Sequence, residues 1–133
     1  MKPYNNSEEL NNILTEIKSI NKYMQEFLWL DFESCYSASK MELAGRISTS
    51  YNEFWVSIEF EDPIFISGPI TFTSTNDKVF IELASYNEFL DINKKYPLEI
   101  GYYLFKISMD DYDNYLYIVS KGLKGILKKI SIN

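Results

Sequence analysis

The spacing of the apolar residues changes once along this chain, and that change constrains the fold more than any other feature. Through residues 6–28 apolar side chains recur every three or four positions, which is the period of one face of an α-helix. From residue 30 onward the period is two, which is typical of strands with one buried and one solvated face. The sequence therefore predicts an N-terminal helix followed by antiparallel strands.

Short alternating segments follow one another along the rest of the chain, separated by turn-forming residues. Pro63 interrupts the run because proline lacks the N–H that a ladder requires, and a bend is expected at Gly68-Pro69. The tail at 123–132 fits both a helical face and a strand, and we expect a closing strand. The other expected strands span residues 30–36, 41–47, 54–60, 64–66, 70–72, 79–83, 100–108 and 115–119.

Two capping boxes mark expected helix starts. Ser85 and Glu88 have the spacing at which each side chain bonds the other residue's backbone N–H, which predicts a short helix over 86–95. Asn6 and Glu9 have the same spacing at the start of the first helix. These elements predict an α+β fold in a single domain over residues 1–133. We expect the N-terminal helix to pack on one side of a strongly bent antiparallel sheet of about six to seven strands.

Catalytic and metal-binding patterns are scarce in this sequence. No histidine is present, although histidine is well suited to proton transfer near neutral pH and is the commonest metal ligand. The one cysteine, Cys35, is close in sequence to Asp31 and Glu33, whose charges disfavour a thiolate. No phosphate-binding glycine loop is present, and the aspartates at 110, 111 and 113 lack the glycine and glutamate of a calcium loop. The sequence therefore predicts a protein that is not an enzyme and binds no cofactor or metal.

Glu59, Glu61 and Asp62 leave one catalytic alternative open. Paired carboxylates cleave glycosides when they are held at a set separation, and the sequence does not fix any separation here. The plainer interpretation is the solvated face of a strand that ends at a proline turn.

The charge of the chain is acidic and unevenly distributed. Nineteen acidic residues against 13 basic ones give a net charge of −6, and residues 26–62 hold eight acids and two bases. Such a field repels nucleic acid and anionic membranes and attracts basic proteins, although surplus acid also keeps a small protein soluble. No secretory signal or membrane-spanning apolar stretch is present. We therefore expect a cytoplasmic protein with no membrane partner and no direct nucleic-acid partner.

Eleven tyrosines and two tryptophans are more than one small core is expected to hold. Several of these rings should lie at the surface, where Tyr and Trp are favoured interface anchors. Alternation places Trp55 on the same strand face as Ser57 and Glu59, where it would be exposed between carboxylates. A second layer, such as the 86–95 segment, could instead cover it.

An acidic, aromatic-rich chain of this size without a catalytic pattern resembles the small acidic immunity proteins of bacterial contact-dependent growth inhibition and other polymorphic toxin systems. The resemblance extends loosely over the whole chain and involves no diagnostic motif. It implies an inhibitor that forms a stoichiometric complex with a cognate toxin, such as a nuclease or another enzyme with a basic cleft. The residues that we predict to bind the partner are Asp31, Glu33, Tyr36, Trp55, Glu59, Glu61 and Asp62.

Two other functions remain open. A phage-encoded anti-defence protein that mimics nucleic acid would carry acidic residues spaced along one elongated surface and would bind a basic target. An enzyme that uses carboxylates alone is the third.

Overall fold

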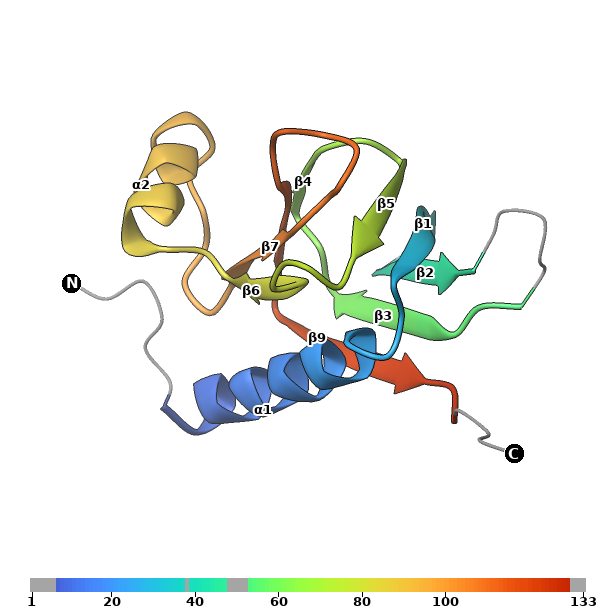
Figure 1. Ribbon diagram of the computed structural model, residues 1–133. Coiled ribbons are helices and arrows are strands. Elements are labelled where there is room, and N and C mark those ends of the chain that lie inside the picture. Colours follow the sequence, from blue (N-terminus) through green and yellow to red (C-terminus); the bar gives the residue numbers. More distant parts are fainter. Residues whose placement is uncertain (1–6, 38, 48–52, 130–133) are drawn as a thin grey trace.

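The computed structural model describes residues 7–37, 39–47 and 53–129, and it confirms the α+β class with an N-terminal helix (Figure 1). Asn6, the connection at 48–52 and the residues beyond 129 lie outside the described residues, so the first capping box stays a prediction. The described elements are α1 (Ser7–Met24), β1 (Trp29–Ser37), β2 (Lys40–Arg46), β3 (Val56–Glu61), β4 (Phe65–Ser67), β5 (Thr71–Thr75), β6 (Ile81–Leu83), α2 (Tyr86–Lys95), β7 (Tyr103–Ile107), β8 (Leu116–Ser120) and β9 (Gly122–Leu127).

The described strands form two antiparallel sheets. The five-stranded sheet has the order β5-β1-β2-β3-β9, and the four-stranded sheet has the order β4-β8-β7-β6. We expected six to seven strands in one strongly bent sheet, whereas nine strands divide between these two. The predicted helix over 86–95 and the closing strand β9 are confirmed. The strands expected at 100–108 and 115–119 are present as β7 and β8, which pair with each other.

A two-stranded ribbon passes from one sheet into the other and explains why there are two. β3 pairs with β9 in the five-stranded sheet, and their chain neighbours β4 and β8 pair in the four-stranded sheet. The ribbon turns at Asp62, which has a positive φ of 45° and precedes Pro63. On the facing strand Lys121 donates its N–H to the Glu61 carbonyl at 2.9 Å. Strands commonly change sheets at such irregular corners.

The helix α1 lies against the free edges of both sheets, along β9 and next to β6 (Figure 1). The Glu16 carboxylate accepts a hydrogen bond of 2.7 Å from the Gly125 N–H of β9. The Asn21 amide donates to the Ile81 carbonyl of β6 at 2.8 Å and accepts from the Ile81 N–H at 3.0 Å. Both strands are the last of their sheets, so α1 satisfies backbone groups that would otherwise stay open.

The core joins α1 to both sheets in one cluster of buried side chains. The apolar stripe of α1 contributes Ile13, Ile17, Ile20 and Met24, as its spacing predicts. Phe32 of β1 stacks on Phe72 and Phe80, with ring centroids 5.4 and 5.0 Å apart, and these rings fill the space between the layers.

We expect Gly125→Ala to destabilise the protein by about 1–3 kcal/mol, because overpacking a filled contact forces neighbours to move. A Cβ at this position would lie only 2.7 Å from Cγ1 of Ile20. Gly122→Ala on the same strand is the matched control, since the nearest atom to its added Cβ would be 3.9 Å away. Urea unfolding measures both variants, and an equal effect of the two would contradict the close packing of α1 on β9.

Candidate protein-binding face

One face of the five-stranded sheet points outward and carries most of the charges of its strands. Residues that are directly paired across an antiparallel ladder lie on the same face. The opposite face holds the core side chains, and in the described part of the chain neither helix lies over the outward one. This outer face consists of Trp29, Asp31, Glu33 and Cys35 of β1, Lys40, Glu42, Ala44 and Arg46 of β2, Ser57, Glu59 and Glu61 of β3, Lys124 and Ile126 of β9, and the threonines at 71, 73 and 75 of β5.

The outer face carries five carboxylates and three cationic side chains, so its charge is negative. Arg46 pairs with Glu33 at 2.7 Å. Glu42 lies directly opposite Glu59, which brings two like charges together on neighbouring strands. Such a pair destabilises a sheet, although Lys124 of β9 lies directly opposite Glu59 on its other side and offsets part of this repulsion.

Small residues form the centre of the outer face. Ala44 and Ser57 are directly paired and buried, Ser57 with only 1% of its surface exposed. Within the described residues, the Ser57 hydroxyl and Nε of Arg46 are buried polar atoms without a hydrogen-bond partner. Because these two small side chains are already buried within the chain, the exposed part of the outer face consists of the charged and larger side chains around them.

Four of the predicted partner-binding residues share this face. Asp31 and Glu33 are on β1, two strands away from Glu59 and Glu61 on β3. Asp31 accepts a hydrogen bond of 2.8 Å from the Thr73 hydroxyl. The side chains at the odd-numbered positions of β1 and β3 therefore point outward, as the alternation predicts.

Three predicted residues lie elsewhere. Asp62 is at the corner after β3, with its carboxylate 3.9 Å from the Lys121 ammonium. Tyr36 is 68% exposed but is paired with the buried Met41, so it belongs to the opposite face near the end of β1.

Trp55 does not extend the outer face. It lies at a bend before β3, and its half-buried ring is 5.9 Å from that of Phe27, which follows α1. The Lys128 ammonium lies 5.1 Å from the centre of the Trp55 ring. The segment that follows α1 therefore covers Trp55, and α2 does not.

Two residues of the outer face were missed by the sequence analysis. Trp29 is 44% exposed, is paired with Thr75, and has the same strand parity as Asp31. That parity is the signal that could have found it. Glu42 lies in the expected strand over 41–47, but its position opposite Glu59 depends on a register that the sequence does not reveal.

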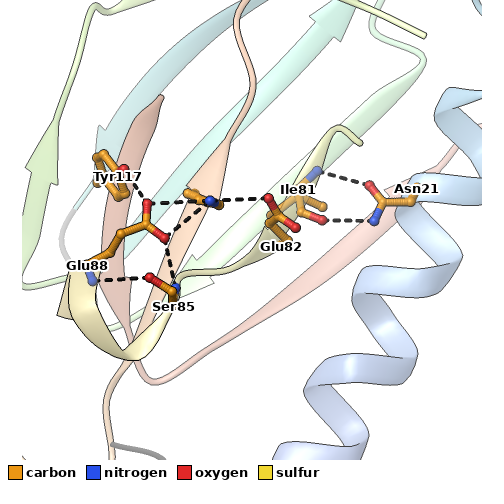
Figure 2. A network of polar contacts seen from close by, with 7 residues as sticks. Asn21, Ile81, Glu82, Ser85, Glu88 and Tyr117 are labelled. Carbon is orange, nitrogen blue, oxygen red and sulfur yellow. Dashed lines mark hydrogen bonds and ion pairs between the residues drawn. The ribbon is translucent and has the colours of Figure 1, made fainter. Parts of the chain in front are cut away.

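A second polar cluster joins α2 to the four-stranded sheet (Figure 2). The predicted capping box is present, since Ser85 and Glu88 bond each other's backbone N–H groups. The Tyr117 hydroxyl donates to the Glu88 carboxylate at 2.6 Å, and the Lys106 ammonium donates to it at 3.2 Å. Lys106 is also 3.4 Å from Glu82, so its charge lies between two carboxylates.

These contacts determine the protonation of Glu88. Partial burial acts to raise the pKa of this carboxyl, but the hydrogen bonds from Tyr117, Ser85 and Lys106 outweigh it and lower the pKa to about 2. Burial and the bond to Glu88 raise the pKa of Tyr117. A carboxylate with so low a pKa is a poor proton acceptor near neutral pH, so the cluster anchors α2 and is not suited to acid–base catalysis.

Within residues 7–37, 39–47 and 53–129, no three carboxylate or thiol side chains gather closely enough to hold a metal ion. Neither described helix is long and apolar enough to cross a membrane. Comparison with protein-family models finds no match, and comparisons with curated proteins and with solved structures find none either.

We expect Glu88→Gln to destabilise the protein by about 2 kcal/mol at pH 7, after allowance for the partial exposure of the group. The folded-state pKa of about 2 is below the ordinary value of 4.5, so the stabilisation is complete above pH 4.5 and is lost as the pH falls toward 2. Urea unfolding across this range should show a steeper loss of stability for the wild type than for the variant. Glu82→Gln, which removes a carboxylate 3.4 Å from Lys106, should change the slope little, and identical slopes for wild type and Glu88→Gln would contradict the assignment.

Proposed function

We propose that this protein is an immunity protein that binds and neutralises a cognate bacterial toxin in the cytoplasm by forming a stoichiometric complex. The observation that carries the proposal is the outer face of the five-stranded sheet, on which carboxylates from three strands gather with no described helix over them. The toxin would be a nuclease or another enzyme with a basic cleft. The protein itself would not be an enzyme.

Each part of the outer face has a role in this complex. The carboxylates steer a basic partner and raise its association rate. Glu42 and Glu59 receive a lysine or arginine of the toxin, which relieves their mutual repulsion. Trp29 supplies an aromatic anchor that becomes desolvated on binding.

The predicted partner-binding residues change accordingly. Asp31, Glu33, Glu59 and Glu61 stay in the proposed interface, with Asp62 at its corner. Trp29 takes the anchoring role that the sequence analysis gave to Trp55. The ring of Trp55 supports the packing against Phe27 instead.

The nucleic-acid mimic is less well supported. A mimic of the phosphate backbone needs negative charges in regular succession. Lys40, Arg46 and Lys124 interrupt the carboxylates on the outer face, and Lys124 lies directly opposite Glu59. Mixed charges of this kind suit a protein surface with its own pattern of both signs.

The double variant Glu59→Lys/Glu61→Lys should slow association with the toxin by about tenfold or more and change its salt dependence, because steering depends on these charges. The toxin is first identified by affinity capture and mass spectrometry, then purified for surface plasmon resonance. Glu99→Lys, an exposed position outside the strands, provides the control for the charge change. Unchanged association of the double variant would contradict this placement of the interface, and capture of no toxin-like protein would contradict the function.

The two tryptophans should respond differently to substitution by alanine. Trp29→Ala should weaken toxin binding by about 2 kcal/mol or more, as loss of an interface anchor does, while the melting temperature changes little. Trp55→Ala should lower the melting temperature, because it removes a ring packed against Phe27. Calorimetric titration and thermal unfolding of both variants test this division, and the reverse pattern would restore Trp55 as the anchor.

A further inference from the structure

Three of the four sheet edges are closed by groups from elsewhere in the chain. Glu16 closes β9 and Asn21 closes β6. At β5, the Thr73 carbonyl accepts from the Asp110 N–H at 2.7 Å, and the Thr73 N–H donates to the Asp111 carboxylate at 3.2 Å. Closure of edges in this way prevents pairing with other chains.

The fourth edge, β4, differs from the others. Among the described residues it pairs with β8 on one side, and no segment or side chain hydrogen-bonds to its other side. Ile66 at its centre is 46% exposed, and the neighbouring Ile64 is exposed as well. β4 has only three residues and is followed by Gly68-Pro69, so its open edge can pair with a short stretch of an added extended segment.

A hollow lies beside this edge, between β4 and α2. Its volume is about 460 Å³. The Phe65 ring of β4 meets the Tyr96 ring after α2, with centroids 5.3 Å apart. The lining is part apolar and part charged, and includes Phe65, Ile66, Tyr96, Glu88, Asp91 and Lys95.

The charges of the hollow indicate what side chain it would accept. Glu88 and Asp91 are carboxylates, and Lys95 is the one ammonium group among the residues that line it. The Glu88 charge is already paired with the Lys106 ammonium and bonded by the Tyr117 hydroxyl, so Asp91 is the carboxylate of the lining that is left to meet a cation from outside. An arginine or lysine side chain fits such a site, since its aliphatic stem packs on apolar surface and its cationic head meets aromatic rings and carboxylate.

We propose that β4 binds an extended segment of a partner protein as an added strand, with an arginine or lysine side chain of that segment in the hollow. Successive side chains of an added strand point to opposite faces, so alternate ones point toward α2. Pairing with the β4 of a second copy does not meet the requirement, because that strand offers Phe65, Ile66 and Ser67 and no cation. The net charge of −6 also opposes self-association. This site is separate from the outer face and does not rest on the proposed toxin.

The test is an NMR titration of the ¹⁵N-labelled protein with a synthetic peptide of nine residues, alternating threonine and valine around a central arginine. Shifts of backbone amides should be confined to β4, α2 and the neighbouring part of β8. The same peptide with a central glutamate should bind at least about tenfold more weakly, and the peptide with N-methylated backbone should not bind. Asp91→Lys should weaken binding of the arginine peptide by about tenfold, and Glu26→Lys in the exposed turn after α1 should leave it unchanged.

Several results would overturn the proposal. These are the absence of any shift, shifts confined to the outer face of the five-stranded sheet, and equal affinity for the arginine and glutamate peptides. A dimer seen by light scattering, with β4 amides shifted as protein concentration rises, would make a second copy the occupant. Because the titration uses no toxin, its outcome is independent of whether the proposed immunity function holds.

Discussion

Two polar side chains of α1 carry the hydrogen bonds on which the arrangement of both sheets depends. Glu16 bonds the edge of one sheet at Gly125, and Asn21, little more than a turn later on the helix, bonds the edge of the other at Ile81. Without them, two open strand edges would lie next to a helix that buries its apolar stripe between them. A buried or half-buried backbone group without a hydrogen-bond partner costs about 1–3 kcal/mol of stability. These contacts therefore determine the position of α1 and also contribute to its stability there.

Closure by α1 also decides which surfaces remain available to other molecules. The helix occupies the core side of the five-stranded sheet and leaves the charged side open. In the same way α2 is held over the four-stranded sheet by Glu88, Lys106 and Tyr117 (Figure 2). It also forms one wall of the hollow beside β4. The outer face and the β4 edge are thus consequences of where the two helices are fixed.

Local patterns in the sequence predicted much of this structure. The period of three to four located α1, the spacing of Ser85 and Glu88 located α2, and alternation turned Asp31 and Glu59 outward. Features that depend on distant pairing could not be predicted in this way. Glu16 meets Gly125 across 109 positions of sequence, and a residue on the polar side of a helical stripe carries no local sign of such a partner.

The bends explain the remaining differences. Trp55 lies at a bend before β3, so its parity with Ser57 does not hold, and its ring packs against Phe27. At Asp62 the positive φ turns the ribbon from one sheet into the other. Alternation alone does not reveal this turn and predicts continued pairing within one sheet. Registers between strands, such as Glu42 opposite Glu59, follow from these corners and from core packing rather than from any single segment.

Amide hydrogen exchange measured by NMR tests the closing of the two edges most directly. If Glu16 and Asn21 hold the edges of β9 and β6, the amides of Gly125 and Ile81 exchange only by opening of the core, as slowly as those of the central strands. Exchange of these two amides at the rapid rate of an open edge strand would show that α1 does not close the sheets.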